Sequence, residues 1–245
     1  MGAPGIIEQL LEGSNTMMRR MFIATCVVLM ATSIVFAADG TTVGPWNKMN
    51  EKAGIVAYAR ANSRSPVNEV KAVGIIKEPV PVVESLFRDF SAWKQFMFMA
   101  KVTDSVDTPN LKSSSDTRYI YIKQGFPWPM SDRDGIAKVD FSINRNTGEV
   151  RLICRSVSTD YRIDPKVIRM PLVEMVWILK PVAEGTELTY QNLAAPGGNL
   201  PAAPINFISK HIGVNTLLNI RDMVKQEKYQ SRTIITQTLW QPRND

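Results

Sequence analysis

The sequence predicts an α+β fold in which a curved antiparallel sheet wraps around one long C-terminal helix. Before residue 196 the mature chain offers a series of strand-like runs, and no strand–helix–strand alternation that would indicate a parallel sheet. Pro196–Lys228 then begins with a glycine turn, followed by prolines that a first helical turn tolerates. A helix of about 25 residues would be roughly 37 Å long. Such a helix needs a large apolar partner, which the sheet supplies.

One face of the predicted helix is apolar at helical spacing. The residues on this stripe are Ile205, Ile208, Ile212, Thr216, Ile220, Met223 and Val224. Charged residues such as Lys210 and Arg221 lie largely off it. The stripe is therefore the surface that we expect the sheet to cover, with a cavity between them.

The N-terminal segment is typical of a secretory signal rather than of a folded domain. A basic start at Met17–Arg20 precedes an apolar run, Met21–Phe36, and Val35-Phe36-Ala37 places small residues at a cleavage site. We expect cleavage after Ala37, export to the periplasm or the medium, and Met1–Thr16 to be an over-extended start. An uncleaved membrane anchor is the alternative, although the run is short for a span. The domains are thus 1–37, a signal peptide, and 38–245, one ligand-binding domain.

Composition and charge limit the function classes. The 245-residue chain is 44% hydrophobic and 21% charged, which is ordinary for a globular protein. Its formal charge of +6 is spread along the chain without basic runs, so we expect no nucleic-acid partner and at most a weak attraction to anionic membranes. Cys26 lies in the signal, which leaves Cys154 without a disulfide partner.

The strands are predicted from alternating apolar residues between turn signals. They are Ile55–Arg60, Glu69–Ile76, Arg118–Gln124, Asp134–Asn144, Glu149–Ser158, Met170–Lys180 and Thr186–Asn192. Arg145–Gly148 joins two of them as a hairpin. Asp107–Asp116 and Asp160–Arg169 are predicted loops, and Phe126–Pro129 cannot continue a central strand because proline cannot donate to its ladder.

Two short helices are expected before the sheet's middle strands. Pro45–Lys52 is predicted to be helical with Trp46 as a buried anchor, and Val82–Phe90 is an amphipathic helix. Trp93–Ala100 is rich in aromatic residues and methionine. It is either part of the core or an apolar lip at the mouth of a cavity.

Nothing in the sequence forms a catalytic or metal-binding constellation. His211, the sole histidine, has no evident nucleophile beside it and is expected at the surface. Ligand clusters for a metal are not visible, so no cofactor is expected. Asp132, Arg133 and Asp134 are expected to cap a turn and pair locally. Gly197-Gly198 is read as a turn rather than a phosphate-binding loop.

Three motifs in this order resemble the START domain, the lipid-transfer module related to steroidogenic acute regulatory protein. They are Trp128–Asp134, opening a strand; Val167–Arg169, running on to Val182; and Thr189–Pro201, leading into the helix that ends with Arg221–Lys225. The resemblance covers nearly all of the mature chain. It implies a helix-grip fold with a lipid-sized tunnel between the sheet and the helix. Sterol-binding members of this family carry an acid and a base inside the tunnel, whereas Ile120 and Val139 stand near those places here.

From the alternation and the helix stripe, we expect the ligand to be bound by apolar side chains with a few polar anchors. The predicted binding residues are Ile120, Val139, Phe141, Leu152, Leu188, Tyr190, Asn192, Ile208, Ile212, Thr216 and Ile220, with Ser156 as a further polar anchor. Substitution of Val139 by Trp should fill the space while the chain still folds. The predicted gate is Asp160–Lys166 together with the C-terminal helix, hinged at Gly197-Gly198.

The predicted function is that of a monomeric, non-enzymatic carrier of a lipid or another hydrophobic molecule, in transient contact with membranes. Burial of each methylene group gains about 0.8 kcal/mol, so shape and burial suffice for binding. A polyketide cyclase-like enzyme is the alternative, and it would need acid–base groups in the tunnel. An interaction module with a filled core is the second alternative.

Overall fold

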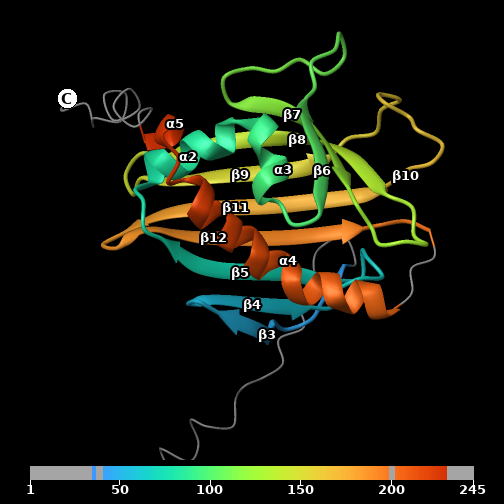
Figure 1. Ribbon diagram of the computed structural model, residues 1–245, viewed down its shortest axis with the longest axis horizontal. Coiled ribbons are helices and arrows are strands. Elements are labelled where there is room, and N and C mark those ends of the chain that lie inside the picture. Colours follow the sequence, from blue (N-terminus) through green and yellow to red (C-terminus); the bar gives the residue numbers. More distant parts are fainter. Residues whose placement is uncertain (1–34, 37–40, 199–201, 231–245) are drawn as a thin grey trace, which may run out of the picture.

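A curved antiparallel sheet with helices on one face forms the body of the molecule, as the sequence predicts (Figure 1). The computed structural model describes residues 35–36, 41–198 and 202–230. The spatial order of the main strands is β3 (Asn47–Lys52), β4 (Ile55–Arg60), β5 (Glu69–Ile76), β12 (Gly185–Ala195), β11 (Leu172–Val182), β9 (Glu149–Ser156), β8 (Arg133–Asn144), β7 (Thr117–Gln124) and β6 (Ala100–Ser105). A short strand, β10 (Ile168–Arg169), pairs in parallel with the start of β8. Separately, β1 (Val35–Phe36) pairs with β2 (Thr42–Val43).

The helices lie on one face of this sheet, and the first of them connect strands that are consecutive in sequence but far apart in the sheet. β5 pairs with β12, whereas β6 lies at the far edge. The crossing is made by α2 (Val80–Arg88), the 3-10 helix η1 (Phe90–Ala92) and α3 (Trp93–Phe96). The long helix α4 (Ala202–Met223) then runs diagonally over the same face (Figure 1). The predicted α+β helix-grip architecture is therefore confirmed.

The predicted helix at Pro45–Lys52 is wrong, because this segment forms the edge strand β3. Apart from Met49 its residues are polar, so the sequence carries no alternation, and pairing with β4 decides its conformation. Trp46 is not a buried anchor. It is half-buried, with the Arg60 guanidinium and the Lys71 ammonium lying 4.2 and 4.4 Å from the centroid of its ring.

A strand was missed at Ala100–Ser105, which forms β6 on the opposite edge. The helix predicted at Val82–Phe90 instead spans Val80–Arg88, because prolines are tolerated in its first turn. Phe90 begins the 3-10 turn that follows.

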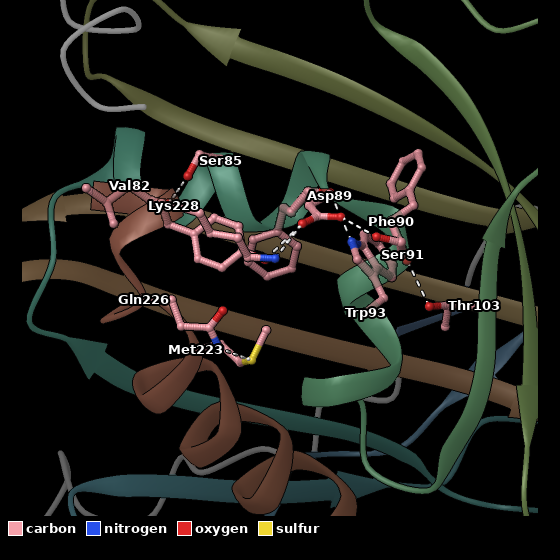
Figure 2. Close-up of polar contacts among 12 residues, drawn as sticks. Val82, Ser85, Asp89, Phe90, Ser91, Trp93, Thr103, Met223, Gln226 and Lys228 are labelled. Atoms are coloured by element: carbon pink, nitrogen blue, oxygen red, sulfur yellow. Dashed lines mark hydrogen bonds and ion pairs between the residues drawn. The ribbon is translucent and has the colours of Figure 1, made fainter. Parts of the chain in front are cut away.

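The long helix is also shorter than predicted. It ends at Met223, and a separate short helix, α5 (Glu227–Gln230), follows. Figure 2 shows how Lys228 reaches Asp89, just after α2, where Lys228 Nζ donates to Asp89 Oδ2 at 3.0 Å. Tyr229 Oη donates to the same oxygen at 3.0 Å. Ser91 Oγ donates to the other carboxylate oxygen at 2.6 Å. The end of the chain's helical region is therefore fastened to the crossing segment.

Aromatic side chains fill the space between the crossing segment and the sheet. Trp177 on β11 stacks on Tyr190 of β12 with ring centroids 4.1 Å apart, and Phe87 lies 4.8 Å from Trp177. Trp93 and Phe96 complete this group and are fully buried. Of the two interpretations of the Trp93–Ala100 segment, core packing therefore holds for these two residues.

Candidate functional site

An apolar pocket lies between the first half of α4 and the concave face of the sheet, beside the turn that precedes the helix. Its free volume is about 60 Å³. It is lined by Val67, Asn68, Val70, Gln124, Phe126, Met170, Asn192, Ala194, Pro196, Ile205, Ile208, Ser209 and Ile212. The polar groups in this wall are amides and one hydroxyl, and none of the lining residues titrates near neutral pH.

A second, smaller pocket continues inward along the sheet. It has a volume of about 20 Å³ and shares Gln124, Met170, Asn192 and Ala194 with the first. Its remaining wall is formed by Met97, Ile122, Gly135, Ile136, Ala137, Val173, Met175 and Tyr190. The two spaces together form an apolar path from α4 toward the aromatic core.

The free space is small compared with ordinary ligand pockets, which measure about 300–1,000 Å³. Its walls, however, contain methionines at 97, 170 and 175, whose unbranched side chains repack at low cost. An acyl chain is larger than this free space, so it would fit only if the walls rearranged.

The second half of α4 is anchored by several hydrogen bonds. Arg221 donates to the carbonyl oxygens of Ile75 and Ala53, at 2.9 and 2.7 Å, and Asn219 donates to that of Phe96 at 3.2 Å. At Gly213, midway along the helix, a built Cβ would lie only 2.7 Å from Ala72 Cβ, so glycine permits the helix to lie close on β5. The pocket lies on the N-terminal side of these anchors.

The structure brings some of the predicted ligand-binding residues to the pockets. Asn192, Ile208 and Ile212 line the larger pocket, and Tyr190 and Asn192 line the smaller one. The others lie within the packed core and line neither space: Ile120, Val139, Phe141, Leu152, Leu188, Thr216 and Ile220. Their burial agrees with the predicted alternation, but they pack against other core side chains and not against free space.

Two of the predicted polar anchors already accept hydrogen bonds from the backbone. Thr216 Oγ1 accepts a hydrogen bond from the Phe98 N–H at 3.2 Å, and Ser156 Oγ accepts one from the Val173 N–H at 3.2 Å. Burial raises the pKa of Tyr190, so its phenol stays neutral. Asn192 is left as the anchor that both pockets share.

Gln124, Phe126 and Met170 line the larger pocket and were missed by the sequence interpretation. Gln124 follows Ile120 and Ile122 on the inward face of β7, so continued alternation could have found it. Phe126 lies outside the strands, where no periodic signal exists. Met170 was predicted to begin a strand, but it lies in the short connection between β10 and β11.

The Asp132-Arg133-Asp134 segment is only partly local in its pairing. Asp132 does brace the turn, since it accepts hydrogen bonds from the Phe126 N–H at 3.3 Å and Lys101 Nζ at 2.8 Å. Asp134 instead pairs with Arg169, which is distant in sequence, through Nε and Nη2 at 2.6 and 3.1 Å. The prediction of local pairing is therefore wrong for Asp134.

The chain's histidine and its described cysteine have structural surroundings. His211 is half-buried on α4, with Nδ1 2.8 Å from the carbonyl oxygen of Phe207, one turn earlier. Cys154 is fully buried in the core, and this burial raises the pKa of its thiol. Among residues 35–36, 41–198 and 202–230, no group of His, Cys, Asp and Glu is arranged to hold a metal ion. In the same residues, no helix has the length and apolar character needed to cross a bilayer.

Solved structures of known proteins share this architecture. A STAR-related lipid transfer protein from Xanthomonas axonopodis superposes with a TM-score of 0.66 at 26% identity, over 74% of this chain and 99% of that one. The chain has a START-like fold. Human StAR-related lipid transfer protein 5 superposes with the same TM-score at 13% identity, over 90% of this chain and 99% of its own, which concerns the fold alone.

Sequence comparison finds a bacterial relative of this chain. An uncharacterized protein of Pseudomonas aeruginosa is 24% identical over 204 residues, which cover 82% of this chain and 96% of the relative. No protein-family model matches the chain. The START-like assignment therefore depends on the three-dimensional comparison.

Proposed function

We propose that the protein binds one lipid or similar hydrophobic molecule under the first half of α4 and carries it to or from a membrane. The observation that carries this proposal is the apolar path between α4 and the sheet. The Xanthomonas protein with the same fold is named as a lipid transfer protein, which supports the same ligand class.

The walls of the path favour binding over catalysis. The larger pocket has no acidic or basic side chain, and the phenol of Tyr190 is the one titratable group in the wall of the smaller pocket. A cyclase-like enzyme needs a proton donor or acceptor within hydrogen-bonding reach of the substrate. Transfer of an acyl chain from water, by contrast, needs only apolar area, at about 0.8 kcal/mol per methylene group.

The opening step that we propose is an outward swing of the first half of α4. Gly197 and Gly198 precede it with φ angles of 67° and 63°, which suit glycine, while Arg221 and Asn219 hold the second half. The Asp160–Lys166 loop is the second part of the proposed gate. Arg162 Nη1 in this loop donates to Asp104 Oδ2 at 2.6 Å, so the loop opens only when this exposed ion pair separates.

The test is recovery of the ligand. The protein is purified without detergent from a bacterial host, examined by native mass spectrometry, and extracted with organic solvent. A bound mass that disappears on extraction, and that is identified as a lipid, supports the proposal. Protein that is repeatedly empty, and that binds neither fluorescent fatty acids nor sterols, overturns it.

We also propose that the protein is exported and acts as a monomer. Residues 1–34 and 37–40, which contain most of the predicted signal, lie outside the described residues, so export depends on the sequence alone. N-terminal sequencing of the protein from a periplasmic extract should begin at Ala38. A protein that retains Met17–Ala37 in the membrane fraction would instead be anchored.

A further inference from the structure

Arg133 is a buried guanidinium on the concave side of the sheet. It is 2% exposed, which places it among the largest fully buried side chains of the described residues. Its β7 partner in the ladder is Gln124, which lines both pockets. Alternation places Arg133 on the same face of β8 as Gly135 and Ala137, which line the smaller pocket. The side chain therefore belongs to the ligand side of the sheet.

The hydrogen-bonding capacity of this guanidinium is largely unused. Nη1 donates to the carbonyl oxygen of Ser131, whereas Nε is buried and has no hydrogen-bond partner. In residues 41–198 and 202–230, no carboxylate lies within ion-pairing distance of Arg133. A buried cation without a counter-ion is costly, so a structure that retains one suggests that a ligand completes the site.

The neighbouring carboxylates are already engaged elsewhere. Asp132 accepts from Lys101 and from the Phe126 N–H, and Asp134 forms its pair with Arg169. Desolvation lowers the pKa of Arg133 and the charge of Asp132 opposes this, yet the group remains a cation because an arginine pKa starts so high. The site therefore keeps a positive charge.

The guanidinium lines neither pocket itself but lies beside the wall of the larger one. Its central carbon is 4.6 Å from the ring centroid of Phe126, which lines that pocket. On another side, Nη2 would lie 4.0 Å from a Cβ built on Gly198, in the turn that begins at the pocket-lining Pro196. Ile168 of β10 lies opposite Arg133 in the parallel ladder. The loop after β7, β10 and the hinge before α4 thus meet around this cation.

We propose that Arg133 binds the acidic headgroup of the ligand, a carboxylate or a phosphate, beside this wall while the acyl chain lies under α4. The inference depends on the function proposed above and adds the ligand's chemical class. The Nε–Nη2 edge presents two parallel N–H donors, the arrangement that a carboxylate or phosphate accepts as a bidentate pair. The amides of Gln124 and Asn192 then lie farther along the path, next to the chain.

Arg169, at the same end of the sheet, has many more hydrogen-bond partners than Arg133 and serves as a comparison. Its guanidinium binds both oxygens of Asp134 and also the carbonyl oxygens of Thr159 and Tyr161. Arg133 has one backbone acceptor and an aromatic ring. The contrast favours a role in ligand binding for Arg133.

The experiment compares ligands that share one chain and differ in headgroup. Delipidated wild-type protein is titrated with oleic acid, oleyl phosphate and oleyl alcohol, each below its aggregation limit, by displacement of a fluorescent fatty alcohol. We expect both acids to bind at least tenfold more tightly than the alcohol, because hydrogen bonds to charged groups are the stronger kind. The ratio of the two acids distinguishes a carboxylate from a phosphate headgroup.

The variant Arg133→Met keeps an unbranched side chain over Phe126 and removes the charge. It should lose the preference for acids while binding oleyl alcohol within about twofold of wild type. Arg155→Met, which removes an exposed arginine on the outer face of β9, is the control and should behave as wild type. Arg133→Lys keeps the charge without the fork and should retain a weakened preference.

The outcomes separate the two proposals. Wild-type protein that binds oleyl alcohol as tightly as oleic acid and oleyl phosphate overturns the role of Arg133 and leaves the hydrophobic pocket standing. An unchanged acid preference in Arg133→Met has the same meaning, whereas an unchanged preference in Arg133→Lys overturns only the two-point binding by the guanidinium fork. Wild-type protein that binds none of the three ligands overturns the carrier function, and the headgroup proposal with it. The wild-type comparison decides the matter even if the methionine variant fails to fold.

Discussion

Asp134 on β8 and Arg169 on β10 form a two-point ion pair across the parallel ladder that closes one end of the sheet. The Asp134 side chain is only 2% exposed, while the Arg169 side chain is 30% exposed. Arg169 also holds carbonyl oxygens of the loop that precedes β10. The pair thereby links the sheet to part of the proposed gate.

Asp134→Asn should therefore destabilise the protein, because it leaves Arg169 facing a neutral amide in a buried place. We expect the free energy of unfolding to fall by about 2–4 kcal/mol, somewhat less than for a fully buried pair. Urea unfolding measures the change. Asp222→Asn removes the exposed partner of Lys225 and is the control, with an expected loss of less than about 0.5 kcal/mol. Equal effects of the two substitutions would contradict the structural role of Asp134.

The pocket itself can be tested by filling it. Ile208 is half-buried on the first half of α4 and lines the larger pocket. Ile208→Trp should reduce ligand uptake about tenfold or more, since the added ring occupies the acyl path. Phe207→Trp changes the adjacent, largely exposed residue and should leave uptake unchanged. Uptake of a fluorescent fatty acid, with circular dichroism as the folding check, gives the answer; full binding by Ile208→Trp would place the ligand elsewhere.

The substitution Val139→Trp, which the sequence suggests as a tunnel-filling change, has a different expected outcome in the structure. Val139 is fully buried in the core and lines neither pocket. Overpacking there should destabilise the protein by about 1–3 kcal/mol or more. Thermal unfolding should show this loss, and a stability equal to that of wild type would mean that unoccupied space does lie next to Val139.

Local patterns in the sequence predict a strand best where one face of the strand is buried and the other is exposed. Glu149–Ser156 alternates along its length and Arg133–Asn144 alternates from Ala137 to Ser142, and their hairpin was predicted within a few residues. Asn47–Lys52 and Ala100–Ser105 are edge strands with largely polar or half-buried residues, so no alternation marks them. Pairing with the next strand along the chain, Ile55–Arg60 for the first and Thr117–Gln124 for the second, fixes their conformation.

The candidate site was less predictable than the fold. The inward faces of the central strands follow from alternation, but the pattern cannot tell a tunnel wall from a packed core. Here Phe87 and Phe96 of the crossing segment meet Trp177 of a distant strand and fill one end of the concavity. The free space therefore lies at the other end, under Ile208 and beside Phe126.

The hinge before α4 gives a further prediction. Gly197 has a φ angle of 67°, and a Cβ there would lie 3.2 Å from Ile168 Cγ2. Gly197→Ala should lower stability by about 1 kcal/mol or more and change the rate of ligand exchange, because the turn can no longer relax as glycine does. Gly54→Ala is the control, since Gly54 has a similar φ angle of 70° but nothing within 4 Å of its Cβ position. If both variants exchange ligand at the wild-type rate, the hinge lies elsewhere.

The contact between Asp89 and the C-terminal segment predicts a specific pH dependence. Burial tends to raise the pKa of Asp89, but hydrogen bonds from Ser91, Lys228 and Tyr229 outweigh this and hold the pKa below its ordinary value of 3.8. A carboxylate with a depressed folded-state pKa stabilises the protein above the unfolded pKa, and this stabilisation is lost as the pH falls through the folded value.

Asp89→Asn should therefore destabilise the protein at neutral pH, by about 1–2 kcal/mol, because the charge-assisted hydrogen bonds that fasten α5 to the end of α2 are weakened. The difference between the variant and wild type should stay constant from about pH 5 to pH 7 and shrink below about pH 4, since wild-type Asp89 is then protonated as well. Urea unfolding of both proteins at a series of pH values measures this. A difference that stays constant down to about pH 2 would mean that the charge of Asp89 does not hold α5 in place.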